Sequence, residues 1–214
     1  MYLFQPVNDV LAAYNEQHGI IDVPIKADLL KPIFENLGYV ETIYFEELHI
    51  EFNHIIARIT THACSTGVYR ESGTYARIQL SSGQSPFWKR FALTKEMYQC
   101  ILDREHGNRI TSTVELLRLG DHFTNDLLDA IADESEDERF PPFDTDQLAV
   151  LMALETLFPI ELRRHYFDQY DADNSIVAQL AIRFQIPIQV VEMGMNNASY
   201  TSAVLRGRAD HFVI

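Results

Sequence analysis

Near the N-terminus, apolar residues recur three and four positions apart. Over residues 6–18 they are Val7, Val10, Leu11 and Tyr14. This is the period of one buried helical face, and it predicts a helix there. The same period continues over residues 22–38, where Asp22 can cap the start and Gly38 favours the end. Pro32 falls inside this second pattern, so the sequence predicts a kink or two short helices.

From residue 39 the spacing changes to the alternation that is typical of β-strands. Residues 39–63 are rich in β-branched and aromatic side chains, which predicts two strands. The alternation runs through Ile55, Ala57, Ile59 and Thr61. A third strand is predicted between Gly73 and Gly83. Three neighbouring strands joined by short links predict a small, mainly antiparallel sheet.

Helical spacing returns after Pro86 and continues through the second half of the chain. Helices are predicted over residues 87–103, 111–134 and 144–158, and three shorter helical segments follow. This order of elements predicts an α+β fold, in which an early three-stranded sheet is followed by a helical half.

Composition narrows the function classes. The 214 residues are 47% hydrophobic, which is enough for an ordinary core, and no apolar run approaches the ~20 residues of a membrane helix. The N-terminus has neither the basic region nor the cleavage site of a secretory signal, so we expect a cytoplasmic protein without membrane contact. The formal net charge of −14 disfavours direct nucleic-acid binding, which depends on Lys and Arg. It favours a protein partner or a cation.

The stretch "FALTKEMYQCILD" at residues 91–103 has the spacing of a zinc protease helix that carries H-E-x-x-H. In such proteases two histidines four residues apart bind the metal, and the glutamate acts as the general base. Glu96 stands at the glutamate position, but Lys95 and Gln99 stand at the two histidine positions. This stretch therefore keeps the carboxylate of the motif without its imidazoles.

Three blocks of the chain resemble the ImmA/IrrE-type metallopeptidases. They are "GIIDVPIKADLLKPIFENLGY", "ARIQLSSGQSPFWKRFALTKEMYQCIL" and "DTDQLAVLMALETLFPIELRR", in this order along the chain. Family members are zinc-dependent endopeptidases that typically cleave a helix-turn-helix repressor. The resemblance implies a zincin-like domain over residues 1–158 with an active-site helix. It also implies a helix-turn-helix-like extension over residues 159–196, packed on the first domain, and a C-terminal tail over residues 197–214.

The resemblance, carried over residue by residue, implies a damaged metal site. Glu96 falls on the general base, as a vestigial catalytic residue, while Lys95 and Gln99 fall on the histidine positions. Asp146 and Leu148 fall on the acidic positions of the third block, and only Asp146 offers a carboxylate. An ammonium has no lone pair, and an amide oxygen is a poor zinc ligand. We therefore expect no metal and no other cofactor.

Two interpretations of Lys95 remain open from the sequence. In the first, its ammonium takes the place of the metal and pairs with Glu96 and Asp146. In the second, the side chain extends to water beside an ordinary amphipathic helix.

Other candidate sites are less specific. An alternative metal site could draw on the remaining imidazoles and thiols, which are His49, His54, His62, Cys64 and Cys100. We expect exposed sheet histidines and buried thiols instead. Residues 175–195 have the helix, turn and helix of a DNA-binding motif. Their second half contains Glu192 and no Lys or Arg, so packing within the fold is the favoured role.

Together these patterns predict an inactive ImmA/IrrE-type peptidase homologue that binds a protein in transcriptional, stress or phage-related regulation. The expected partner is a protein such as a transcriptional regulator, bound in a groove around Tyr98, Arg90 and Gln79, and the chain could also form a homo-oligomer. One alternative is an active zinc-dependent endopeptidase with unconventional ligands, which would cleave a repressor-type partner. Another alternative is a structural or assembly protein on the same scaffold.

Overall fold

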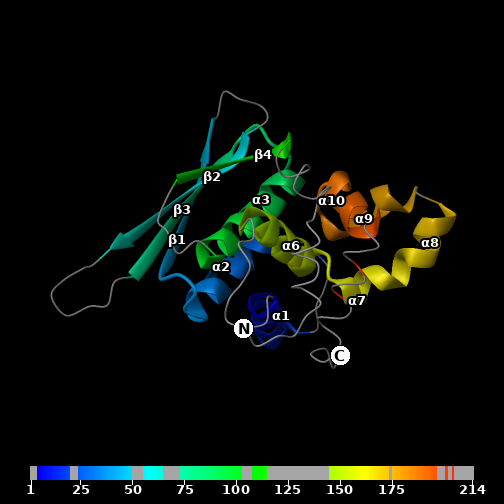
Figure 1. Ribbon diagram of the computed structural model, residues 1–214, viewed down its shortest axis with the longest axis horizontal. Helices are drawn as coiled ribbons and strands as arrows, with labels where there is room; N and C mark the ends of the chain where they lie inside the picture. Colours follow the sequence, from blue (N-terminus) through cyan, green and yellow to red (C-terminus); the bar gives the residue numbers. More distant parts are fainter. Residues whose placement is uncertain are drawn as a thin grey trace.

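The computed structural model describes residues 4–19, 24–49, 55–64, 73–102, 108–114, 145–173 and 175–196, together with residues 201 and 204. These residues form an α+β fold, as the sequence predicts, with a β-sheet on one side of a group of helices (Figure 1). The predicted cap at Asp22, nearly all of the helices over residues 111–134, and almost all of the tail lie outside the described residues.

The sheet has four described strands instead of the three predicted. They are β1 (Thr42–Leu48), β2 (Ile55–Cys64), β3 (Gly73–Ser81) and β4 (Asn108–Ser112). Their spatial order is β1-β3-β2-β4, with β1 parallel to β3 and the other neighbours antiparallel. The prediction missed β4 because five residues give too little alternation to mark a strand, and pairing with β2 stabilises it.

The two faces of the sheet differ in burial. Across β2 and β3, Ile59 pairs with Ile78 on a buried face, whereas Arg58 pairs with Gln79 on the opposite face. The buried face packs against the helix α3 (Pro86–Leu102). On β4, Thr111 pairs with the buried Ala57, so its side chain faces α3 as well.

The N-terminal helices follow the predicted pattern, with one exception. α1 (Gln5–His18) and α2 (Ala27–Asn36) bury the apolar stripe that their sequences predict. Of the two alternatives predicted at Pro32, two short helices is wrong, because α2 is a single helix with Pro32 inside it and exposed. Proline removes one helical hydrogen bond, and packing of the apolar face, which includes Phe34, maintains the helix. Gly38, just after α2, has a φ of 75°, which favours glycine.

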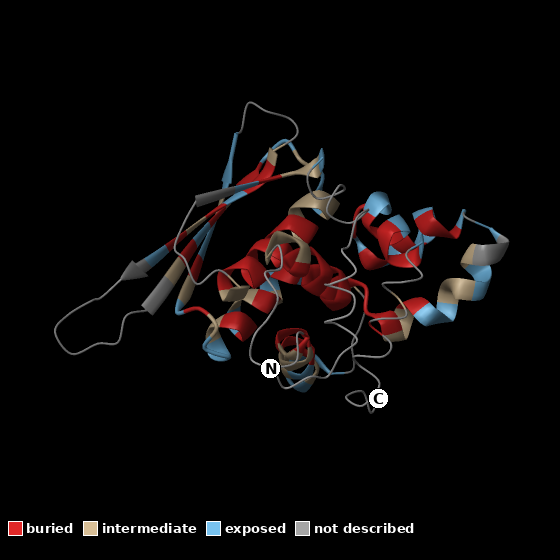
Figure 2. Ribbon diagram, viewed as in Figure 1, coloured by how far each residue is buried: buried red, intermediate tan, exposed pale blue. Residues whose placement is uncertain are grey.

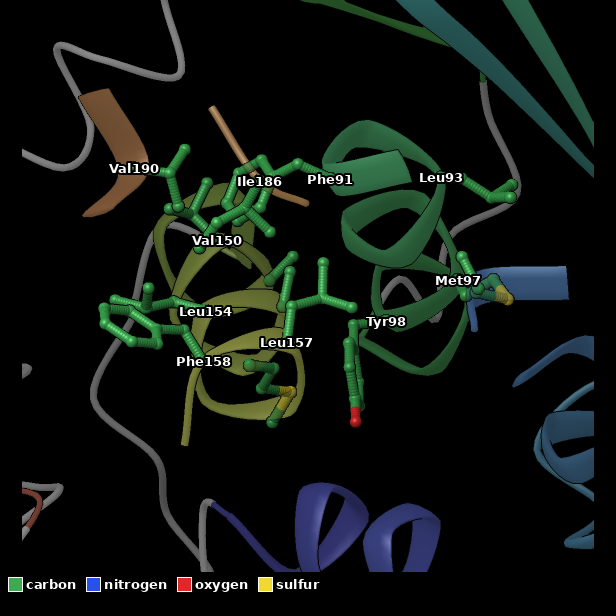
Figure 3. Packing of buried hydrophobic residues seen from close by; sticks show 14 of the residues in the cluster. Phe91, Leu93, Met97, Tyr98, Val150, Leu154, Leu157, Phe158, Ile186 and Val190 are labelled. Carbon is green, nitrogen blue, oxygen red and sulfur yellow. The ribbon is translucent and has the colours of Figure 1, made fainter. Parts of the chain in front are cut away.

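The centre of the molecule is the pair α3 and α6 (Thr145–Leu157). Residues 91–100 of α3 and residues 148–157 of α6 are buried without a break (Figure 2). Figure 3 shows Tyr98 of α3 beside Leu157 of α6, with Leu154 one turn away. Truncation of such a leucine to alanine costs about 2–5 kcal/mol. Ten consecutive buried residues on each helix mean that any polar side chain among them requires an internal partner.

The C-terminal helices continue directly from α6. They are α7 (Ile160–Arg163), the 3-10 turn η1 (Arg164–Tyr166), α8 (Phe167–Ala172), α9 (Ile176–Phe184) and α10 (Ile188–Asn196). Ile186 and Val190 lie close to α6 (Figure 3). Arg163 forms an ion pair with Glu155 of α6, and both side chains are fully buried. The division of the chain into domains stays a prediction.

No single helix in the described part of the chain has the length and hydropathy to cross a membrane. α9 and α10 meet those criteria only when they are taken together, and the pair is bent by 115° at the break between them.

Candidate functional site

α3 carries three polar side chains into the core. Lys95 is 2% exposed, and Glu96 and Gln99 have no exposed surface. Residues three and four apart lie on the same side of a helix, so the three side chains share the face that meets β4 and the start of α6. An isolated buried charge costs several kcal/mol, and these groups are therefore stable there only with partners.

The ammonium of Lys95 has three oxygen partners. Its Nζ lies 2.5 Å from Oδ1 of Asp146, 3.2 Å from Oγ1 of Thr111 and 3.5 Å from Oε1 of Glu96. The predicted pairing of Lys95 with both carboxylates is confirmed. The alternative, in which Lys95 extends to water, is wrong because its side chain is buried.

Two threonines complete the cluster, and the sequence interpretation missed both. Thr111 of β4 accepts a hydrogen bond from Lys95 and donates one to Oε1 of Glu96. Thr145, at the start of α6, accepts a hydrogen bond of 3.1 Å from Nε2 of Gln99. No local motif marks either threonine, and only the pairing of β4 with β2 brings Thr111 over α3. We call Lys95, Glu96, Gln99, Thr111, Thr145 and Asp146 the α3 polar cluster.

The electrostatics of the cluster favour different states for its members. Burial by itself would lower the pKa of the Lys95 ammonium, but the carboxylates of Glu96 and Asp146 outweigh it and raise the pKa. Burial raises the pKa of Glu96, and the nearby Lys95 and the Thr111 hydrogen bond only partly oppose this. Lys95 is therefore charged at neutral pH, and Asp146, which has the shorter contact, is its main counter-ion.

The donors of the cluster do not fit the zinc ion that the resemblance implies. The Lys95 ammonium lies between the two carboxylates and has no lone pair. Gln99 directs its NH₂ group at Thr145, and Leu148 is a buried apolar residue. Among the residues that the structure describes, no group of three or more His, Cys, Asp or Glu is placed to hold a metal ion.

The alternative set of histidines and cysteines is only partly described. His49 and His62 are exposed. Cys100 is a buried free thiol that donates to the backbone carbonyl of Glu96. His54 and the side chain of Cys64 lie outside the described residues.

The structure does not bring the predicted groove residues together. Tyr98 has no exposed surface, and its hydroxyl lies 2.6 Å from Oγ1 of Thr156. A partner cannot contact Tyr98 in this conformation. Gln79 lies on the other face of the sheet from α3, where its amide donates to Glu46. The expected groove around these residues is therefore wrong in its composition.

Arg90, the third residue assigned to the groove, connects three segments of the chain. Its guanidinium donates to the backbone carbonyls of Phe184 and Gln185, at the end of α9, and to that of Ile25 before α2. Burial lowers the pKa of Arg90 to about 10, so it remains charged at neutral pH. Gln185 has a left-handed φ of 52°, which suits a tight turn between two helices. Arg90 therefore fixes the last helical pair against α3.

No protein-family model matches the chain. No curated protein is significantly similar to it in sequence.

Proposed function

We propose that the chain is a catalytically inactive relative of the ImmA/IrrE-type metallopeptidases. It acts by binding a protein in transcriptional, stress or phage-related regulation. The observation that carries the proposal is the position of Lys95, whose ammonium lies between Glu96 and Asp146 on the helix where a peptidase would hold zinc. A fixed positive charge at that place pairs with both carboxylates and leaves neither an open ligand position nor a metal-bound water.

The edge strand β4 supports a role in protein binding. Among the described strands it pairs only with β2, and an edge strand offers backbone groups to an added strand. Ile110 on β4 is 55% exposed, and Val114 just after it is 69% exposed. These apolar side chains beside an edge favour an extended protein segment as the partner. Thr111 connects the same strand to the α3 polar cluster.

The net charge of −14 favours a basic or neutral partner over an acidic one. A helix-turn-helix regulator encoded by a neighbouring gene is the partner to test first. Isothermal titration with the purified regulator measures the affinity for the wild type and for the Ile110→Lys variant. We expect Ile110→Lys to weaken binding at least about tenfold, which is a loss of about 1.4 kcal/mol.

The matched control is Ile182→Lys. Ile182 is 70% exposed on α9, away from the sheet, and this variant should bind as the wild type does. The proposal fails if no neighbouring regulator binds and the chain does not self-associate. Cleavage of the regulator that a chelator stops would favour the active peptidase instead. Association that disappears with added salt and is insensitive to Ile110→Lys would favour an assembly protein.

A further inference from the structure

The charges of the α3 polar cluster do not balance when every group has its usual ionisation. Lys95 contributes one positive charge, while Glu96 and Asp146 contribute two negative charges. Glu96 has no exposed surface, whereas Asp146 is 23% exposed in its side chain. Water can therefore reach Asp146 but not Glu96, and the excess negative charge falls on the buried group. An uncompensated buried carboxylate costs several kcal/mol.

The hydrogen bonds of the cluster show the same imbalance. The three N–H groups of Lys95 are directed to Asp146, Thr111 and Glu96, and the Thr111 hydroxyl donates to Oε1 of Glu96. Two buried oxygens of the cluster have no hydrogen-bond partner among the described residues, Oε2 of Glu96 and Oε1 of Gln99. Both are acceptors if Glu96 is ionised. Two buried acceptors on neighbouring side chains with no donor between them are unfavourable.

We propose that the cluster binds one proton on Oε2 of Glu96, and that the resulting carboxylic acid donates a hydrogen bond to Oε1 of Gln99. Residues three apart are neighbours on a helix, so the two side chains are within reach of each other. One proton balances the charge and gives both orphan oxygens a partner. Together with the Lys95 ammonium it supplies two positive charges, as many as a divalent ion would.

The surroundings of Glu96 are consistent with a neutral acid. Among the described residues, the charged groups that act on it are Lys95 on its own helix and Asp146 on α6, while β4 contributes the uncharged Thr111. On β2 and β3, Arg58 and Arg77 lie on the exposed face of the sheet and point away from α3. Burial raises the pKa of Glu96. A protonated Glu96 cannot accept a proton from water, so the residue at the general-base position cannot act as a general base.

This inference rests on charge and hydrogen-bond geometry and is independent of the proposed function. The first test is the thermal unfolding of Glu96→Gln at pH 7. The glutamine amide has the shape of the neutral acid, and its NH₂ group can donate to Gln99 in the same way. We expect the Tm of this variant to be no lower than about 2 °C below the wild-type value.

The matched control is Asp146→Asn, which also replaces a carboxylate by an amide but removes the main counter-ion of Lys95. We expect its Tm to fall by several degrees. The proposal is overturned if Glu96→Gln lowers the Tm as much as Asp146→Asn does, or if it does not fold, because a charged Glu96 would then be required.

A second measurement does not depend on unfolding. Infrared difference spectra of the wild type minus Glu96→Gln at pH 7 should show the C=O stretch of one protonated carboxylic acid. A difference spectrum that contains only the two bands of an ionised carboxylate would contradict the proposal. A partner that still binds the Glu96→Gln variant would leave the proposed function intact in either case.

Discussion

Replacing Lys95 by methionine tests whether the ammonium is required by the carboxylates around it. Methionine retains most of the length and apolar volume of the lysine stem, so the change removes the charge and leaves little cavity. It leaves Asp146 and Glu96 facing each other without the cation that now lies 2.5 Å and 3.5 Å from them.

The expected loss of stability in Lys95→Met follows from the burial of its ion pairs. Removal of one partner from a buried ion pair costs about 3–5 kcal/mol. Asp146 is 23% exposed, so water recovers part of its solvation and we expect a loss near the lower limit, about 3 kcal/mol. For a domain of about 200 residues, 1 kcal/mol corresponds to about 2–4 °C. The Tm of Lys95→Met should therefore fall by about 6–12 °C.

The assay is thermal unfolding at pH 7, followed by circular dichroism and calorimetry. Lys31→Met is the matched control, because Lys31 forms a partly exposed i,i+4 pair with Glu35 at 3.6 Å, and such surface pairs contribute about 0–1 kcal/mol. A Lys95→Met variant that melts within about 2 °C of the wild type would mean that the carboxylates do not require the ammonium. It would show that Lys95 is only a space-filling side chain.

Three further predictions concern the same core. Thr111→Val removes the hydroxyl shared by Lys95 and Glu96. Denaturant unfolding should show a free energy of unfolding that is lower by about 1–3 kcal/mol. A decrease below about 0.5 kcal/mol would contradict the stabilising role of this hydroxyl. In Gly194→Ala the new Cβ would lie 2.9 Å from Nη1 of Arg163 and 3.3 Å from Cδ1 of Leu154. Because both contacts are too short, we expect the free energy of unfolding to fall by about 1–3 kcal/mol. An unchanged stability would show that α10 can shift. The pKa of Glu96 is higher in the folded state than its value near 4.5 in the unfolded chain. Protonation of Glu96 therefore stabilises the fold, and this contribution is complete below the unfolded pKa. It is lost as the pH rises through the folded pKa. The Tm of the wild type relative to Glu96→Gln should therefore decrease from pH 5 to pH 9, and a constant difference would contradict the raised pKa.

Local patterns predicted most of the fold. A helix or strand with one buried face repeats its apolar residues at a regular spacing, and this spacing can be recognised in the sequence. Val7 and Val10 show the helical spacing, and Ile59 and Thr61 show the alternation of a strand. The parallel pairing of β1 with β3 was not visible, because β2 lies between these strands along the chain and the links give no indication of strand direction. β4 was missed because it is short and depends on its tertiary partner.

The sequence predicted the residues of the candidate site that lie on α3, but not the threonines that β4 and the start of α6 bring beside α3. Lys95, Glu96 and Gln99 share a helical turn, so their common face follows from spacing alone. Tyr98 was wrongly assigned to a partner groove, because residues 91–100 of α3 are buried and the sequence does not reveal which faces of a helix are covered. Nothing local in the sequence marks the two threonines, because only the fold places Thr111 beside Lys95 and Thr145 beside Gln99.

We propose that the Lys95 ammonium occupies the place where a zinc peptidase would hold its metal ion. The most direct measurement is the zinc content of the purified wild type and of the double variant Lys95→His with Gln99→His, determined by mass spectrometry after dialysis against zinc. In the double variant, two imidazoles four residues apart and Asp146, which now contacts the ammonium, offer zinc three ligands of types it favours. We expect no stoichiometric zinc in the wild type and about one zinc per chain in the double variant. One zinc per wild-type chain, or a double variant that binds none although it folds, would contradict this proposal.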